Sequence, residues 1–167
     1  MRRRKLWLAL LIALAVTPML VFFFADAMLK DFAGLHPGDR LPLLPLQTAD
    51  GRSVPTSTWH GVRTVLVVFQ PGCDACRLEI NGLESIAPYF PEVRIVLLST
   101  ENSPAGIRPV FPVYVDPDGR FLKQVRKLVT PTIYWFDPLG QVRYARAGQR
   151  DAQEEEGLFR RLMKDER

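Results

Sequence analysis

The sequence is poor in histidine and cysteine, two of the side chains that most often bind zinc and copper. It has two residues of each type in 167. His36 and His60 lie in segments that predict loops, and they do not have zinc-finger ligand spacing relative to Cys73 and Cys76. We therefore expect no metal site, and we expect both histidines on the surface.

An excess of positive charge is missing from most of the chain. The formal net charge is +4, but residues 1–30 hold five lysines and arginines and one aspartate, and residues 31–167 hold 17 basic and 17 acidic residues. The basic residues of this larger part are scattered. A surface that binds nucleic acid needs clustered positive charge, so we expect no nucleic-acid partner. The chain also lacks internal repeats and low-complexity segments.

Charge is absent from one long stretch, residues 6–25, which follows the basic cluster 2–5. A run of about 20 apolar residues is long enough to span a bilayer as a helix. Membrane helices tolerate a proline such as Pro18. The basic cluster predicts a cytoplasmic N-terminus in a single-pass inner-membrane protein, with the rest of the chain on the periplasmic or extracytoplasmic side.

A cleaved signal peptide is the alternative interpretation of residues 1–30. Ala25-Asp26-Ala27 has the small residues of a cleavage site, although the apolar run is longer than the roughly 7 to 15 residues of a typical signal core. Both interpretations export the remainder of the chain. The sequence thus predicts an anchor or signal segment in 1–30, a linker in 31–40 and a folded domain in 41–167.

The only cysteines form the motif Cys73-Asp74-Ala75-Cys76. The apolar run at 64–69 predicts a buried strand, and residues 74–89 predict a helix, so the pair lies at a strand-to-helix junction. A disulfide across two residues closes a very small loop and removes little entropy from the unfolded chain, which makes it a poor structural cross-link. This placement favours a redox-active cysteine pair.

The order of the predicted elements indicates the fold class. The strand at 64–69, the helix after it and a strand at 94–99 make a βαβ unit, whose strands are parallel and joined by a right-handed crossover. The other expected elements are an edge strand or extended arm at 41–47, a turn at Asp50-Gly51, a polar loop or short turn at 55–61, a loop at 101–112, a strand at 113–115, a helix at 121–128, an antiparallel hairpin of strands 132–136 and 142–147, and a helix at 153–164. The sequence therefore predicts an α/β fold with a central mixed sheet flanked by helices.

This order resembles the thioredoxin fold, with Cys-x-x-Cys at the first helix and Val129-Thr130-Pro131-Thr132 before the hairpin. Within that fold the chain looks like the membrane-anchored thiol–disulfide oxidoreductases of the TlpA/ResA type, over about residues 34–165. The matching features are the N-terminal anchor, Gly38-Asp39-x-Leu41-Pro42, Asp50-Gly51 and a glutamate, Glu79, after the cysteine pair. The resemblance implies reduction of protein disulfides, with cytochrome c maturation as the suggested setting. It also implies a membrane electron donor, and no cofactor beyond the redox-active disulfide Cys73–Cys76.

The position of each cysteine on the predicted helix indicates a division of roles within the motif. Cys73, at the positive end of the helix dipole, would be the attacking sulfur, because the dipole lowers the pKa of its thiol. Cys76, one turn deeper, would resolve the mixed disulfide. A carboxylate at Asp74 would raise the thiol pKa and favour a mild reductant. The alternative is that Asp74 is a first-turn residue favoured by the dipole alone.

Four more residues receive roles from the resemblance. Glu79 would lie close to the cysteines and influence their acidity or proton transfer; the alternative is a solvated surface glutamate. Pro131 would be a cis-proline beside the cysteine pair, or else a plain turn proline. The backbone of Thr130 would pair with an extended substrate segment. Gly72 stands where many relatives have tryptophan, which changes the surface next to the reactive sulfur.

Other functions remain as alternatives. Copper chaperones of related fold use Cys-x-x-x-Cys with a later histidine, and no histidine follows Cys76. Peroxidases of related fold carry a threonine shortly before their cysteine, whereas Gln70 stands three residues before Cys73. A non-catalytic binding module would keep its function when Cys73 is replaced by serine. In addition, residues 101–112 predict no helix where relatives usually have one, so the partner is not carried over.

Overall fold

The computed structural model describes residues 16–18, 34–102, 109–124 and 129–165. The chain divides into two compact units, residues 1–32 and 33–167, and each is described here by itself. In the first unit, residues 16–18 are helical. The rest of the predicted membrane span, residues 6–25, lies outside the described residues. Within the described ranges, no helix is long and apolar enough to cross a membrane.

The second unit is built on a seven-stranded sheet with the strand order β2-β1-β5-β4-β3-β6-β7. The strands are β1 (Pro45–Thr48), β2 (Ser53–Pro55), β3 (Arg63–Phe69), β4 (Val93–Ser99), β5 (Val113–Val115), β6 (Thr132–Phe136) and β7 (Val142–Ala147). The helices are α2 (Asp74–Ile86), α3 (Arg120–Gln124) and α4 (Ala152–Asp165), with short 3₁₀ turns η2 (Thr56–Trp59) and η3 (Ala87–Tyr89).

The sheet is mixed, as predicted. β3 pairs in parallel with β4, and β4 pairs in parallel with β5. β6 is antiparallel to β3, and β7 is antiparallel to β6, which confirms the hairpin. The crossover helix of the predicted βαβ unit is α2. This topology brings the carboxyl end of β3, where the cysteine motif follows, next to the start of β6.

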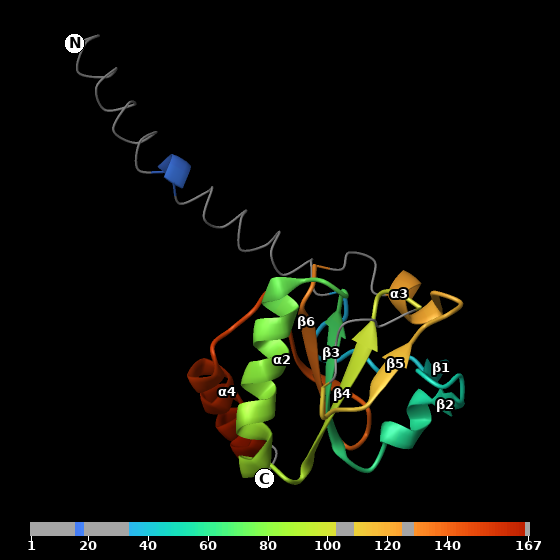
Figure 1. The fold of residues 1–167 in the computed structure, drawn as a ribbon. Helices are drawn as coiled ribbons and strands as arrows, with labels where there is room; N and C mark the ends of the chain where they lie inside the picture. Colours follow the sequence, from blue (N-terminus) through green and yellow to red (C-terminus); the bar gives the residue numbers. More distant parts are fainter. Residues whose placement is uncertain (1–15, 19–33, 103–108, 125–128, 166–167) are drawn as a thin grey trace, which may run out of the picture. The chain divides into compact units, whose positions relative to one another are not determined.

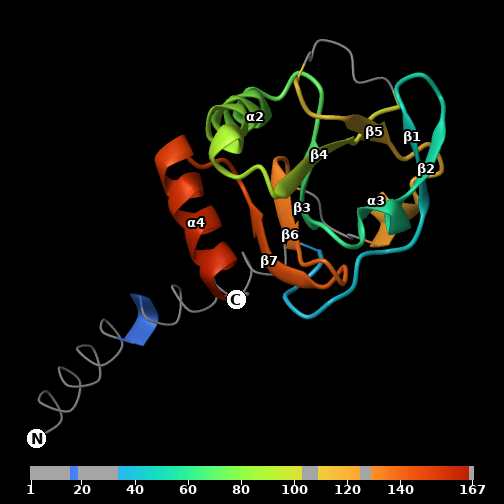
Figure 2. The same ribbon diagram turned by 90° about the horizontal axis from the view of Figure 1, so that it is seen from below.

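Helices cover both faces of the sheet. α2 and α4 lie side by side on one face (Figure 1), and α3 and η2 lie on the other (Figure 2). The central strands β3 and β4 are therefore buried on both sides, which is why their sequences are continuous apolar runs rather than alternating ones. Consecutive residues of these strands point to opposite faces and divide between two hydrophobic clusters.

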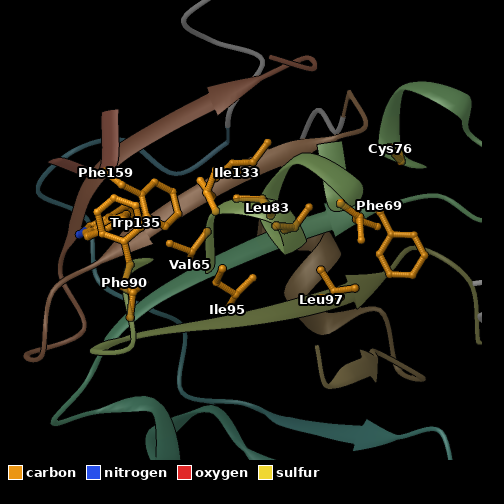
Figure 3. Packing of buried hydrophobic residues seen from close by; sticks show 14 residues of the cluster. Val65, Phe69, Cys76, Leu83, Phe90, Ile95, Leu97, Ile133, Trp135 and Phe159 are labelled. Carbon is orange, nitrogen blue, oxygen red and sulfur yellow. The ribbon is translucent and has the colours of Figure 1, made fainter. Parts of the chain in front are cut away.

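The cluster under α2 and α4 reaches the cysteine motif. It extends from Cys76 and Phe69 at one end to Phe90, Trp135 and Phe159 at the other (Figure 3). The Trp135 and Phe159 rings meet edge to face with centroids 4.8 Å apart. Aromatic contacts of this geometry add about 1 kcal/mol beyond the area they bury. The packing fixes α2, and with it the depth of Cys76, against the sheet.

Two segments before β3 differ in part from their predictions. Residues 41–47 were expected as an edge strand or an extended arm. The edge placement was wrong, because β1 begins at Pro45 and pairs with both β2 and β5. β1 is an internal strand because the three-residue strand β2 pairs along its outer side. The segment 55–61 was expected as a polar loop or short turn, and it contains the short turn η2 after the end of β2. Trp59 of this segment is buried in the core, which was not predicted.

The remaining elements lie close to their predicted positions. α4 begins one residue earlier and ends one later than expected, and β4 begins one residue earlier. α3 begins one residue early and its described part ends at Gln124, while residues 125–128 lie outside the described residues. Upstream of β1, Leu35 is buried, and the Gly38 amide donates to the Val142 carbonyl oxygen at 2.8 Å. Residues 34–40, inside the predicted linker, thus contact the folded unit.

Candidate active site

The chain turns sharply between β3 and α2. Gly72 has a φ of +78°, in the left-handed region where a side chain is unfavourable. Cys73 then takes the N-cap position of α2 with extended backbone, and its Sγ accepts a hydrogen bond from the Cys76 amide at 3.1 Å. The sulfur therefore occupies the place that an oxygen side chain usually takes at a helix N-terminus.

Cys73 and Cys76 form a disulfide bond. Their Cα atoms are 5.2 Å apart, within the usual range for a disulfide. Cys76 is completely buried in the hydrophobic cluster under α2, whereas Cys73 is only partly buried. Of the two sulfurs, Cys73 Sγ is the one that another molecule can reach.

A loop from a distant part of the sequence lies against Cys73. The Thr130–Pro131 peptide bond is cis. Cys73 Sγ lies 3.9 Å from the Thr130 carbonyl oxygen and 3.9 Å from the Thr130 hydroxyl. Pro131 is buried at the start of β6, and Val129 beside it is 42% exposed. The structure thus brings three of the predicted site residues, Cys73, Thr130 and Pro131, together across 57 residues of sequence.

Two predicted site residues lie on the surface beside the disulfide. Gly72 is exposed, and a Cβ built on it would meet no atom within 4 Å. Asp74 is also exposed and forms an ion pair with Arg77 at 2.8 Å. The sequence analysis missed this partner, although the three-residue spacing in a helix could have identified it. Because both side chains are well exposed, solvent screens the pair and it contributes little free energy.

Glu79 is buried, not a solvated surface residue, with 1% of its side chain exposed. It lies three residues after Cys76 on the inner side of α2. One carboxylate oxygen accepts from Arg146 Nη2 at 2.6 Å, and the other accepts from the Arg150 amide at 2.9 Å. The side chain is therefore fixed by groups from β7 and from the loop that follows β7.

A second carboxylate shares the same arginine. Arg146 Nη2 also donates to Glu155 of α4 at 2.8 Å, and Arg146 Nη1 donates to the Gly148 carbonyl oxygen. Glu79, Arg146 and Glu155, called here the carboxylate–arginine cluster, are all nearly inaccessible to solvent. Burial raises the pKa of the Glu155 carboxyl, Arg146 opposes that shift, and the negative charge of Glu79 adds to it.

The sequence analysis did not find Arg146 or Glu155. One signal was present, since Glu155 lies three and four residues before the buried Leu158 and Phe159 and so falls on the apolar face of α4. Glu79 lies in the same way among the buried residues of α2. An acidic residue on a buried helix face predicts a buried cation, but nothing in the sequence identifies which one.

Both histidines are exposed, as predicted. In the ranges that the structure describes, no three His, Cys, Asp or Glu side chains are grouped so that they could hold a metal ion.

No protein-family model and no curated protein matches this sequence. Solved structures do match. One is a Chlorobium tepidum protein described as a thiol:disulfide interchange protein DsbE. It superposes with a TM-score of 0.67 at 22% identity, over 77% of this chain and 96% of that one. A secreted Mycobacterium tuberculosis disulfide oxidoreductase, homologous to E. coli DsbE, matches with a TM-score of 0.57 at 18% identity, over 69% and 92% of the two chains.

The similarity extends to a different chemistry. A thiol peroxidase from Chromobacterium violaceum matches with a TM-score of 0.62 at 16% identity, over 80% of this chain and 89% of that one. The fold alone therefore does not distinguish disulfide exchange from peroxide reduction. The chain has a thioredoxin-like fold, and its Cys-x-x-Cys disulfide lies beside a cis-proline loop.

Proposed function

We propose that this protein is a thiol–disulfide oxidoreductase that acts through Cys73 and Cys76. The observation that carries the proposal is the asymmetric disulfide, with an accessible Cys73 sulfur at the N-terminus of α2 and a fully buried Cys76. Attack on a disulfide needs a thiolate that can be reached, and a helix N-terminus stabilises negative charge. Resolution needs a second thiol that is shielded from competing partners.

The exchange takes place in two steps. In the reduced protein the Cys73 thiolate attacks one sulfur of a client disulfide, forms a Cys73–client bond, and releases the other client sulfur as a thiolate that takes up a proton. The Cys76 thiol then loses its proton and attacks Cys73 Sγ. This second attack forms the Cys73–Cys76 disulfide and releases the second client sulfur, which is also protonated. Two electrons pass from the cysteine pair to the client.

The surroundings of Cys73 support a protein client. The Thr130–Pro131 loop lies against the sulfur, exposed Val129 adjoins that loop, and a Cβ atom built on the exposed Gly72 would meet no atom within 4 Å. An extended segment that carries a disulfide would fit beside this loop, with the Thr130 backbone as its hydrogen-bonding partner. Glu79, one turn below Cys76, would then influence the acidity of the pair.

We propose further that the protein is exported, is tethered by residues 6–25 and works as a reductant. The uncharged run behind a basic cluster supports the tether. A reductant on that side of the membrane would need a membrane electron donor, because the surroundings are oxidising. Reduction of apocytochrome cysteines before haem attachment is the setting that we favour.

Serine variants of the two cysteines test the reaction. Reduction of a small disulfide-containing protein by the full-length chain, with a dithiol as electron source, is expected to be lost in Cys73→Ser. Cys76→Ser is expected to accumulate a mixed disulfide between Cys73 and its client, because the second attack is blocked. Ala75→Ser is the matched control, since it places the same side chain at an exposed position between them. Full activity in Cys73→Ser would instead indicate a non-catalytic binding module.

The reduction potential tests the direction of electron flow. We expect a value on the reducing side, closer to the roughly −270 mV of thioredoxin than to the roughly −120 mV of a strong periplasmic oxidant. Equilibration of the full-length protein with glutathione or dithiothreitol buffers measures it. A potential near that of the strong oxidant would contradict the reductant proposal and leave the exchange chemistry intact.

A further inference from the structure

The carboxylate–arginine cluster connects the cysteine helix to two other elements. Arg146 of β7 donates from the single atom Nη2 to Glu79 of α2 and to Glu155 of α4. Its other terminal nitrogen donates to the Gly148 carbonyl, and the Gly148 amide donates to the Pro131 carbonyl at 2.8 Å. The cluster therefore joins the cis-proline loop to the helix turn that follows Cys76.

The charges of the cluster do not balance. Two carboxylates face one guanidinium, so the cluster has one excess negative charge when both acids are ionised. The three side chains are 1%, 6% and 2% exposed for Glu79, Arg146 and Glu155, so water screens this charge poorly. Among the described residues, Glu155 Oε1 is buried without a hydrogen-bond partner. An ionised oxygen in that position is costly, and a proton on the Glu155 carboxyl removes the excess charge.

We propose that Glu155 is a positioning residue of the cysteine site, acting through Arg146 and Glu79, and that its protonation makes the charge beside Cys76 depend on pH. This inference rests on the proposed function of the same site. When Glu155 is protonated, the cluster is neutral; when it is ionised, the cluster is negative and disfavours the thiolate form of the pair. Burial raises the pKa of Glu155, so this change takes place at a higher pH than it would for an exposed glutamate.

Other charged groups lie around Glu155 and act on its carboxyl group. Arg146 of β7 pairs with Glu155 directly, and Glu79 of α2 shares that arginine. Arg150, in the loop before α4, lowers the pKa of Glu155 by its charge and lies 5.9 Å over the Tyr144 ring. Both carboxylate oxygens of Glu79 accept hydrogen bonds, whereas Glu155 Oε1 has no partner among the described residues. Glu155 is therefore the carboxylate of the cluster that a proton would relieve.

Glu155→Gln tests the proposal. Glutamine keeps the shape and the acceptor for Arg146 but carries no negative charge. The measurement is the rate at which the reduced full-length chain reacts with iodoacetamide, assigned to Cys73 or Cys76 by peptide mass, as a function of pH. We expect the rate ratio of variant to wild type to be near one at low pH, and to rise roughly three- to tenfold once Glu155 ionises in the wild type.

Glu156→Gln is the matched control. It removes the same charge from the next residue of α4, where Glu156 pairs with Arg160 toward solvent. The ratio for this variant is expected to stay near one throughout, because water screens that position. A constant ratio for Glu155→Gln, even one different from one, would overturn the proposal, since a purely structural effect changes reactivity without a titration.

A second variant covers the case in which glutamine disturbs packing. Glu155→Asp keeps the charge and shortens the side chain. If the ratio for Glu155→Asp stays near one at every pH, the charge is responsible. If it rises with pH as the ratio for Glu155→Gln does, the geometry is responsible and the proposal is wrong. Thiol reactivity does not depend on client turnover. Loss of the proposed function in the serine variants and failure of this inference are therefore separate results.

Discussion

At the scale of single residues, the turn before Cys73 depends on a glycine. Gly72 has a positive φ, and open space surrounds the position of a Cβ atom. Gly72→Ala is therefore expected to destabilise the folded state through backbone strain alone, by about 1–2 kcal/mol. Chemical unfolding of the oxidised protein measures the effect. The positive φ of Gly72 also disfavours a tryptophan at this position, where many of the oxidoreductases that the chain resembles carry one.

Gly157→Ala is the comparison for that prediction. Gly157 lies inside α4, and a Cβ atom there would also meet nothing within 4 Å. Its backbone is helical, so alanine is expected to raise the stability by about 0.5–1 kcal/mol. Opposite signs of the change in the free energy of unfolding for the two variants would show that backbone conformation decides the effect of alanine. Equal losses of stability would contradict this explanation.

Sequence reasoning at this scale identified Cys73 and Cys76 from their motif and Glu79 from the resemblance, and it missed the two partners of the buried cluster, Arg146 and Glu155. Arg146 was missed because it is 67 residues from Glu79 in the sequence, and only the register of β7 against β6 turns it toward α2. A long-range ion pair of this kind leaves no local pattern in the sequence.

At the scale of elements, the sequence predicts long segments well and short ones poorly. The apolar runs of β3 and β4 identify central strands, because burial on both faces demands apolar residues throughout. β2 has three residues, too few for any periodicity, and without it β1 looks like an edge strand. η2 agrees with the short turn that was one of the two predictions for 55–61, but the burial of Trp59 there was not predicted, although a large aromatic side chain could have indicated it.

The carboxylate–arginine cluster also acts at this scale. α2 and α4 are neighbours on one face of the sheet, and the cluster adds a polar contact next to their shared apolar contact. Removal of one partner from a buried ion pair usually costs about 3–5 kcal/mol, because the remaining charge stays buried. Arg146 is therefore a poor target for a clean functional test, and Glu155→Gln, which leaves no charge unpaired, is the better one.

At the scale of the whole molecule, Glu155 links the stability of the folded unit to pH. Its pKa is raised in the folded state by burial, above a value of 4.5 for the unfolded chain. Between these two values the folded state binds more protons than the unfolded state, so the free energy of unfolding falls as pH rises through that window. The contribution of Glu155 is fully present below about pH 4.5 and is lost once pH exceeds the folded-state pKa.

Denaturant unfolding from about pH 4 to pH 8 measures this dependence. The wild-type free energy of unfolding includes the titration of every carboxylate, so the informative quantity is its difference from that of Glu155→Gln. We expect this difference to favour the wild type most at low pH and to shift toward the variant as pH rises. The pH at which that shift is complete is expected to agree with the pH at which the thiol-reactivity ratio changes, since the folded-state pKa of Glu155 sets both. A difference that stays constant with pH would mean that Glu155 carries no titrating charge in the folded protein.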